Sequence, residues 1–112
     1  MLYGIATLDD QGRASERRIA RVLGWAPGQS LDIKVVDGVI LMRPDPNGSF
    51  HAPHELRVSI PAPIRHWCAL GPGDRVLLVA DPERAVLVVH TMRTLDQLVQ
   101  AHHASMFGGD GT

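Results

Sequence analysis

The chain has few of the features that mark secreted, membrane and metal-binding proteins. Cys68 is the only cysteine among 112 residues, which excludes an intramolecular disulfide and a multi-cysteine zinc site. The longest apolar runs, Val76–Ala80 and Ala85–Val89, are far shorter than the roughly 20 residues of a transmembrane helix. The first residues lack a basic start followed by an apolar stretch, so we expect no signal peptide and a cytoplasmic location.

The chain also lacks an excess of charge of either sign. Its 11 Lys+Arg, 12 Asp+Glu and 6 His give a net charge of −1, which excludes a diffusely basic nucleic-acid binder. Any such role therefore depends on a local basic patch. Apolar residues make up 45% of the chain, as in a folded globular protein, and 112 residues suit one domain better than two independent cores.

The sequence does contain a weak internal repeat. Pro27-Gly28 recurs as Pro72-Gly73, and the same spacing relates Leu23 to Cys68. Each half has the same order of expected elements, namely a short extended piece, a short helix that ends at glycine and proline, and a hairpin. Because each half is too short to bury an apolar face alone, we expect the two halves to bury each other.

The first half, residues 1–44, combines three local patterns of strand, helix and hairpin. Its hairpin turns at Asp37-Gly38, a pair that suits a two-residue turn with positive φ. The positions that carry the patterns are Tyr3–Leu8 for the strand, Ile19, Val22 and Leu23 for the helix, and Leu31, Ile33 and Val35 with Val39–Met42 for the hairpin.

The second half, residues 54–90, repeats this order. Leu56–Ile60 alternates apolar and polar residues like a half-buried strand. Pro61 and Pro63 suit the start of a helix, where a missing N–H costs little. The hairpin that follows turns at Asp81–Arg84 and is apolar at nearly every position, so we expect it to be buried on both faces.

Two segments lie outside the repeat. Residues 45–53 are rich in turn residues and predict a loop that links the halves. Residues 91–112 predict a helix over Thr94–Ser105, capped by Thr94, and a frayed tail from Gly108. Leu95, Leu98 and Val99 form one apolar stripe on that helix, which we expect to pack back on the rest of the domain, although it could instead dock a partner. The fold expected overall is mainly β, a closed barrel of short strands with two outer helices and a C-terminal helix.

The second half resembles the AbrB/MazE/SpoVT swapped-hairpin superfamily. The residues that carry the resemblance are the arginine-containing strand and Ile-Pro step of Arg57–Arg65 and the Gly-Asp pair before the hairpin in Leu70–Val76. The first half is similar through Gly12-Arg13 and Leu23-Gly24 but has Glu16 where the family has proline. The whole arrangement is similar to tandem AbrB-like regulators of high-GC actinobacteria.

The resemblance implies one pseudo-dimeric swapped-hairpin barrel made by both halves. It also implies binding of double-stranded DNA and transcriptional regulation. Some members act as antitoxins of a toxin–antitoxin pair, although the segment after the barrel is short and neutral here. An interaction module that has lost DNA binding is a further alternative, and a dimer of barrels is possible.

Arginines are the candidate site residues. Lys34 is the only lysine, and the segment 12–21 holds four arginines against one acid, Glu16. The planar guanidinium suits phosphate and the guanine edge, although codon bias and a solvated helix face also explain such a cluster. The resemblance implies DNA contacts by Arg13 and Arg57 in the strands and by Arg21 and Arg65 in the helices, with Arg17, Arg18 and His66 as further candidates.

No pattern points to catalysis, a cofactor or a metal site. The remaining histidines lack the spacing of metal ligands, and no nucleophile motif or phosphate-binding glycine loop is present. The sequence therefore predicts a small DNA-binding regulator that is not an enzyme.

Overall fold

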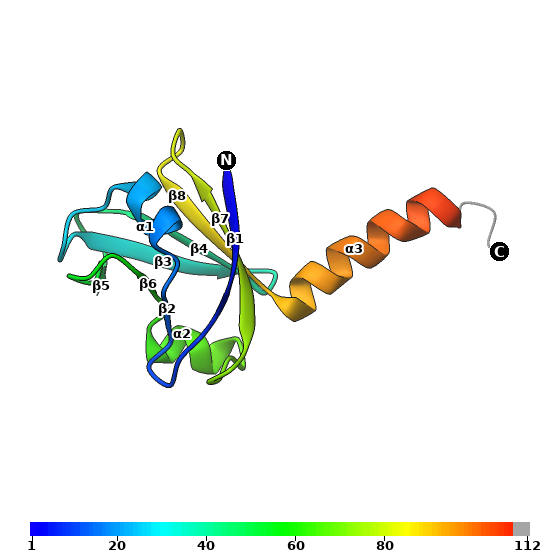
Figure 1. Ribbon diagram of the computed structural model, residues 1–112, viewed down its shortest axis with the longest axis horizontal. Coiled ribbons are helices and arrows are strands. Elements are labelled where there is room, and N and C mark those ends of the chain that lie inside the picture. Colours follow the sequence, from blue (N-terminus) through cyan, green and yellow to red (C-terminus); the bar gives the residue numbers. More distant parts are fainter. Residues whose placement is uncertain (109–112) are drawn as a thin grey trace.

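The computed structural model describes residues 1–108 and is mainly β, with an antiparallel sheet and a C-terminal helix (Figure 1). The elements in chain order are β1 (Leu2–Thr7), β2 (Arg13–Ala14), α1 (Arg17–Leu23), β3 (Ser30–Val36), β4 (Val39–Pro44), β5 (Phe50–His51), β6 (Val58–Ser59), α2 (Ala62–Trp67), β7 (Arg75–Asp81), β8 (Val86–Thr91) and α3 (Met92–Phe107).

The strands of the two halves are interleaved. The main sheet has six strands in the order β1-β7-β8-β4-β3-β5, and β2 pairs with β6 in a separate ladder. All pairs are antiparallel. If β1 is exchanged with β5, β3 with β7 and β4 with β8, the same strand order is obtained, read from the opposite edge of the sheet. The strand order is therefore symmetric. The first strand, β1, pairs with β7 of the second half, and β5, from the segment between the halves, pairs with β3 of the first half.

Both hairpins form where the sequence predicts them. Asp37 and Gly38 connect β3 to β4 with φ values of 52° and 77°, the left-handed conformation that a two-residue hairpin turn needs. The β7–β8 connection is longer, and Ala85 enters β8 with a φ of 53°. Local turn chemistry thus explains the first reversal of the chain. In the second, Asp81 Oδ1 accepts a hydrogen bond from the Arg84 backbone N–H at 3.3 Å, but Ala85 is not a residue that favours positive φ.

The core lies on the inner face of the sheet and under α1. Alternate residues of the hairpin strands are fully buried, as the period of two requires. Val79 is also buried, but Leu77 and Val88 on the outer face are only half-buried. The prediction that the second hairpin is buried on both faces is therefore wrong for most of its outer face, which no helix covers. The largest fully buried side chains are Leu8, Ile19, Leu31, Ile40, Ile60, Leu78, Leu87, Val76 and Val89.

The expected loop over residues 45–53 contains a strand. Phe50 and His51 form β5, which pairs with β3 through Leu31↔Phe50 and Ser30↔His51. A strand of two residues has no alternation that a sequence could reveal, and the surrounding proline and glycine hide it. Conversely, the strand predicted over Leu56–Ile60 is reduced to β6, because only two of its residues pair with β2.

The two short helices begin and end at local signals. Pro61 is the N-cap of α2 and Pro63 lies in its first turn, as predicted. Glu16 caps α1 by accepting a hydrogen bond from the Arg18 backbone N–H at 3.2 Å. The apolar face of α1 is narrower than predicted, since Ile19 is buried but Val22 is 41% exposed.

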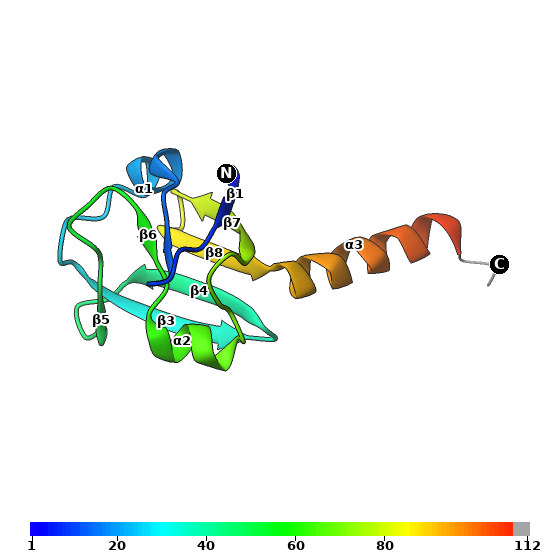
Figure 2. The same cartoon turned by 60° about the horizontal axis from the view of Figure 1, so that its bottom comes forward.

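Helix α3 differs from its prediction in its start and its direction. It begins at Met92, and Thr91 rather than Thr94 is the cap, because the Thr91 Oγ1 accepts from the Thr94 N–H at 3.2 Å. The helix projects away from the sheet, so the expectation that it packs back is wrong (Figure 1; Figure 2). It follows β8 directly, without connecting residues that would let the chain reverse. The expected tail, apart from Gly108, lies outside the described residues.

Candidate nucleic-acid interface

The β2·β6 ladder brings together the arginine-containing segments of both halves. Arg13 pairs with Ser59 and Ala14 pairs with Val58. Ala14 and Val58 are buried in the core, so Arg13 and Ser59 face the opposite way, toward the surface. Arg57 directly precedes this ladder on β6. Helices α1 and α2 lie on either side of β6 in both views (Figure 1; Figure 2).

Arg13 is held by Asp9 at the turn that precedes β2. The Arg13 Nε lies 2.7 Å from Asp9 Oδ2, and Asp9 Oδ1 accepts hydrogen bonds from the backbone N–H groups of Arg13 and Gln11. The backbone bond from Arg13 and the other bonds to the ionised carboxylate lower the pKa of Asp9 to about 2. The pair orients Arg13 and also neutralises part of its charge. Sequence reasoning missed this partner, because the contact depends on the turn between Asp9 and Arg13.

Arg57 differs from Arg13 in lacking such an acid. Within residues 1–108 its side chain forms no ion pair. It is half-buried, and its guanidinium is available to an anion from outside the chain. The two halves therefore present their corresponding arginines in different electrostatic states, one paired and one unpaired.

Arg65 lies across the same turn that positions Arg13. Its Nη1 makes a long contact of 3.5 Å with the Asp10 carbonyl oxygen. Gly12 lies under this side chain with a φ of +74°, and its carbonyl accepts from the Ile60 N–H at 2.9 Å. A Cβ at Gly12 would collide with Arg65 Cδ, so glycine makes the close approach possible.

The arginines of α1 form a second, exposed group beside the ladder. Arg17, Arg18 and Arg21 are all exposed, and α1 contacts β6. Glu16, the one acid among them, lies 3.5 Å from the Arg18 Nε, and its side chain is only 18% exposed. The Glu16 carboxylate thus points toward the start of α1 and toward Gly4. It does not point into the solvent from which a phosphate would approach.

The structure places the predicted residues in three groups. Arg13, Arg57 and Arg65 gather at the β2·β6 ladder and its turn, whereas the α1 arginines flank it. His66 is exposed on α2 beside Trp67, which is 80% exposed. Apart from Asp9 and Asp10 at the turn and the capping Glu16, the surroundings described above supply guanidinium, hydroxyl and backbone groups, which suit an anionic ligand.

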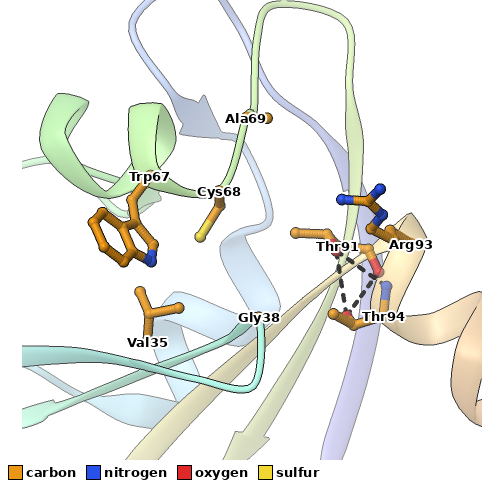
Figure 3. A pocket seen from close by; sticks show the side chains of 8 residues that line it. All are labelled: Val35, Gly38, Trp67, Cys68, Ala69, Thr91, Arg93 and Thr94. Carbon is orange, nitrogen blue, oxygen red and sulfur yellow. Dashed lines mark hydrogen bonds between the residues drawn. The ribbon is translucent and has the colours of Figure 1, made fainter.

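Two other features of the described chain, its groups of potential metal ligands and the pocket beside Cys68, are weak candidates for a site. Among residues 1–108, no three His, Cys, Asp or Glu side chains are placed to hold a metal ion. A pocket of about 180 Å³ separates Trp67 and Cys68 from Thr91, Arg93 and Thr94 (Figure 3). It is smaller than the roughly 300–1,000 Å³ of ordinary ligand sites. Burial also raises the pKa of the Cys68 thiol, which makes it a weak nucleophile.

Comparison of the chain with models of protein families, with curated proteins and with solved structures finds no match in any of the three. In the part of the chain that the structure describes, no helix is long and apolar enough to span a membrane. The case for a function therefore depends on the geometry of the site.

Proposed function

We propose that the chain is a cytoplasmic, DNA-binding transcriptional regulator of AbrB type. The β2·β6 ladder would lie against duplex DNA, with Arg13, Arg57 and Arg65 at its centre. Arg17, Arg18 and Arg21 would reach flanking phosphates from α1, and His66 would do so from α2. The observation that carries the proposal is that one short ladder holds an outward-facing arginine of the first half next to the corresponding arginine segment of the second.

The finer architecture that we propose is a single-chain swapped-hairpin barrel. Its support is the symmetric strand order, in which β1 pairs with the hairpin of the second half and β5 pairs with the hairpin of the first. Further support comes from the positive φ values at matching positions, since Gly24 and Ala69 end the two helices and Gly28 and Gly73 follow them. A pseudo-two-fold binding face suits duplex DNA, whose two strands are related by local two-fold axes.

The test is fluorescence anisotropy with two labelled duplexes, one from the protein's own promoter and one of random sequence, each at two salt concentrations. Binding should weaken with salt, because arginine–phosphate contacts release counterions. Arg57→Ala should weaken binding and reduce the salt slope by about one. Arg84→Ala is the matched control, since it removes the same charge at the distant β7–β8 turn, where Arg84 pairs with Asp81 at 2.7 Å.

For Asp9→Asn we predict the opposite effect on DNA affinity. Removing the carboxylate frees Arg13 and deletes one negative charge from the face, so affinity for both duplexes should rise. Absence of binding to either duplex at low salt would refute the proposal. Equal losses in Arg57→Ala and Arg84→Ala would also refute it, because binding would then follow net charge alone.

A protein-interaction module is the second candidate function. The observation in its favour is α3, whose apolar stripe is exposed rather than packed on the domain. Failure of the wild-type chain to bind DNA would move this candidate to first place.

A further inference from the structure

The outer face of the main sheet is apolar and uncovered. Tyr3 pairs with Val79, Val79 with Val88, and Val88 with Leu41, so four strands place apolar side chains in one row. These positions alternate with the core residues and therefore point outward. A second row runs beside it. The eight members of this outer apolar face are Tyr3, Ile5, Leu77, Val79, Val88, Leu41, Val39 and Val36.

Several members of this face are open to solvent. Tyr3, Ile5 and Val36 are 56%, 60% and 49% exposed. His90 lies among them, half-buried, and burial lowers its pKa, so it is neutral at pH 7. Contiguous apolar surface of this kind marks an interaction site.

Helix α3 has an uncovered apolar face of its own. Leu95, Leu98, Val99 and Met106 lie on one side at helical spacing, with His102 between them. Leu98, Val99 and Met106 are 55%, 41% and 60% exposed. A helix of 16 residues with so little packing is marginal in water, because most helical stability in proteins comes from burial of such a face. We therefore expect another surface to pack against the stripe.

The two uncovered surfaces adjoin but cannot cover each other within one chain. A shallow groove at their junction is lined by Val36, Val39 and His90 of the sheet and by Thr94 and Leu98 of α3. Leu98 is thus the stripe residue that borders the sheet face at this groove. However, β8 ends at Thr91 and α3 begins at Met92, so no residue is left to fold the helix back over its own sheet.

We propose that α3 of each chain packs its stripe on the outer apolar face of a second copy, in a reciprocal, two-fold dimer. One chain supplies both complementary surfaces, as an isologous interface requires. A helix of 16 residues is about 24 Å long, and five strands span about 19 Å, so the helix can cross the face.

The size and charge of the surfaces also suit a second copy. A standard stable interface buries about 1,600 Å² in total, so each of the two helix-on-sheet contacts needs to bury about 400 Å² on each side. Arg93 and Asp96 are the two charged residues of α3, and neither belongs to the stripe. On the sheet side, Lys34 lies next to Leu41 at the β3 end of the face and forms an ion pair with Asp32 at 3.7 Å, so these two charges offset each other. The dimer does not depend on the proposed DNA binding.

The test is the molar mass of the full chain by size-exclusion chromatography with light scattering at micromolar concentrations. The wild type should elute at twice its 12.2 kDa. Leu98→Glu and Ile5→Lys should each give a folded monomer, because both side chains are exposed in the isolated chain. Gln100→Glu, on the polar side of α3, is the control and should stay dimeric. Circular dichroism checks that each variant is folded.

Mixing the two variants gives the sharpest result. The Ile5→Lys chain keeps an intact helix and the Leu98→Glu chain keeps an intact sheet, so the mixture should form heterodimers although each alone is monomeric. A monomeric wild type overturns the proposal, whether or not the chain captures another protein. A dimer that survives Ile5→Lys but not Leu98→Glu also overturns it, since the helices would then pair with each other. A mixture that stays monomeric overturns the reciprocal arrangement.

Discussion

Gly12→Ala and Gly24→Ala should destabilise the protein by very different amounts. Both glycines have the left-handed conformation, with φ values of +74° and +64°, which costs an L residue about 1–2 kcal/mol. Their surroundings differ. A Cβ at Gly24 has no heavy atom within 4 Å, whereas a Cβ at Gly12 would lie 2.6 Å from the Ile60 carbonyl oxygen and against the Arg65 side chain.

The expected magnitudes follow from this difference. Gly24→Ala should cost only the backbone strain, about 1–2 kcal/mol. Gly12→Ala must also displace the backbone at Ile60, an overpacking cost of about 1–3 kcal/mol. It further weakens the bond from the Ile60 N–H to the Gly12 carbonyl, 2.9 Å long and worth about 1 kcal/mol. The total for Gly12→Ala is therefore about 3–6 kcal/mol.

Urea unfolding followed by circular dichroism, at one protein concentration, measures both free energies. The slope m should stay the same in the two variants, so that the midpoints alone report the difference. Equal losses of unfolding free energy in Gly12→Ala and Gly24→Ala would refute the reasoning, because the close approach of Arg65 and Ile60 would then contribute nothing.

Two further perturbations test the helix cap and the acid pair. Thr91→Ala removes the oxygen that accepts a hydrogen bond from the Thr94 N–H. The substitution should lower the free energy of unfolding by about 1 kcal/mol and reduce the helical signal at 222 nm. An unchanged helical signal would contradict the role of Thr91 as the cap. Asp9 has a pKa lowered to about 2, so its ionised form stabilises the fold above about pH 4, and this contribution is lost as the pH falls toward 2. Asp9→Asn should therefore flatten the fall in stability between pH 4 and pH 2, and parallel acid profiles of the two proteins would contradict this role.

Local chemistry in the sequence was sufficient to predict several elements. Asp37-Gly38 allows positive φ at two successive residues, which specifies the first hairpin whatever lies around it. Pro61 and Pro63 mark the start of α2 because proline fits only there in a helix. The candidate arginines could also be identified from the sequence, because a local cluster of basic residues stands out in a chain whose net charge is −1.

Tertiary structure decided where those arginines lie and what they touch. Arg65 reaches the turn before Arg13 because Gly12 leaves room for it, and Arg13 is oriented by Asp9. Neither contact follows from spacing in the repeat, because the first depends on how closely distant backbones approach and the second on the conformation of a single turn.

The sequence by itself determined the positions of the two hairpin turns, the start of α2 and the alternation of the long strands, because these depend on residues a few positions apart. Only the tertiary structure decided that β5 exists, that β2 pairs with β6, and that α3 points away from the sheet. A two-residue strand has no periodicity and forms only when a distant partner supplies its hydrogen bonds. The direction of a helix likewise depends on the strand before it and on which surfaces are left to cover its apolar face.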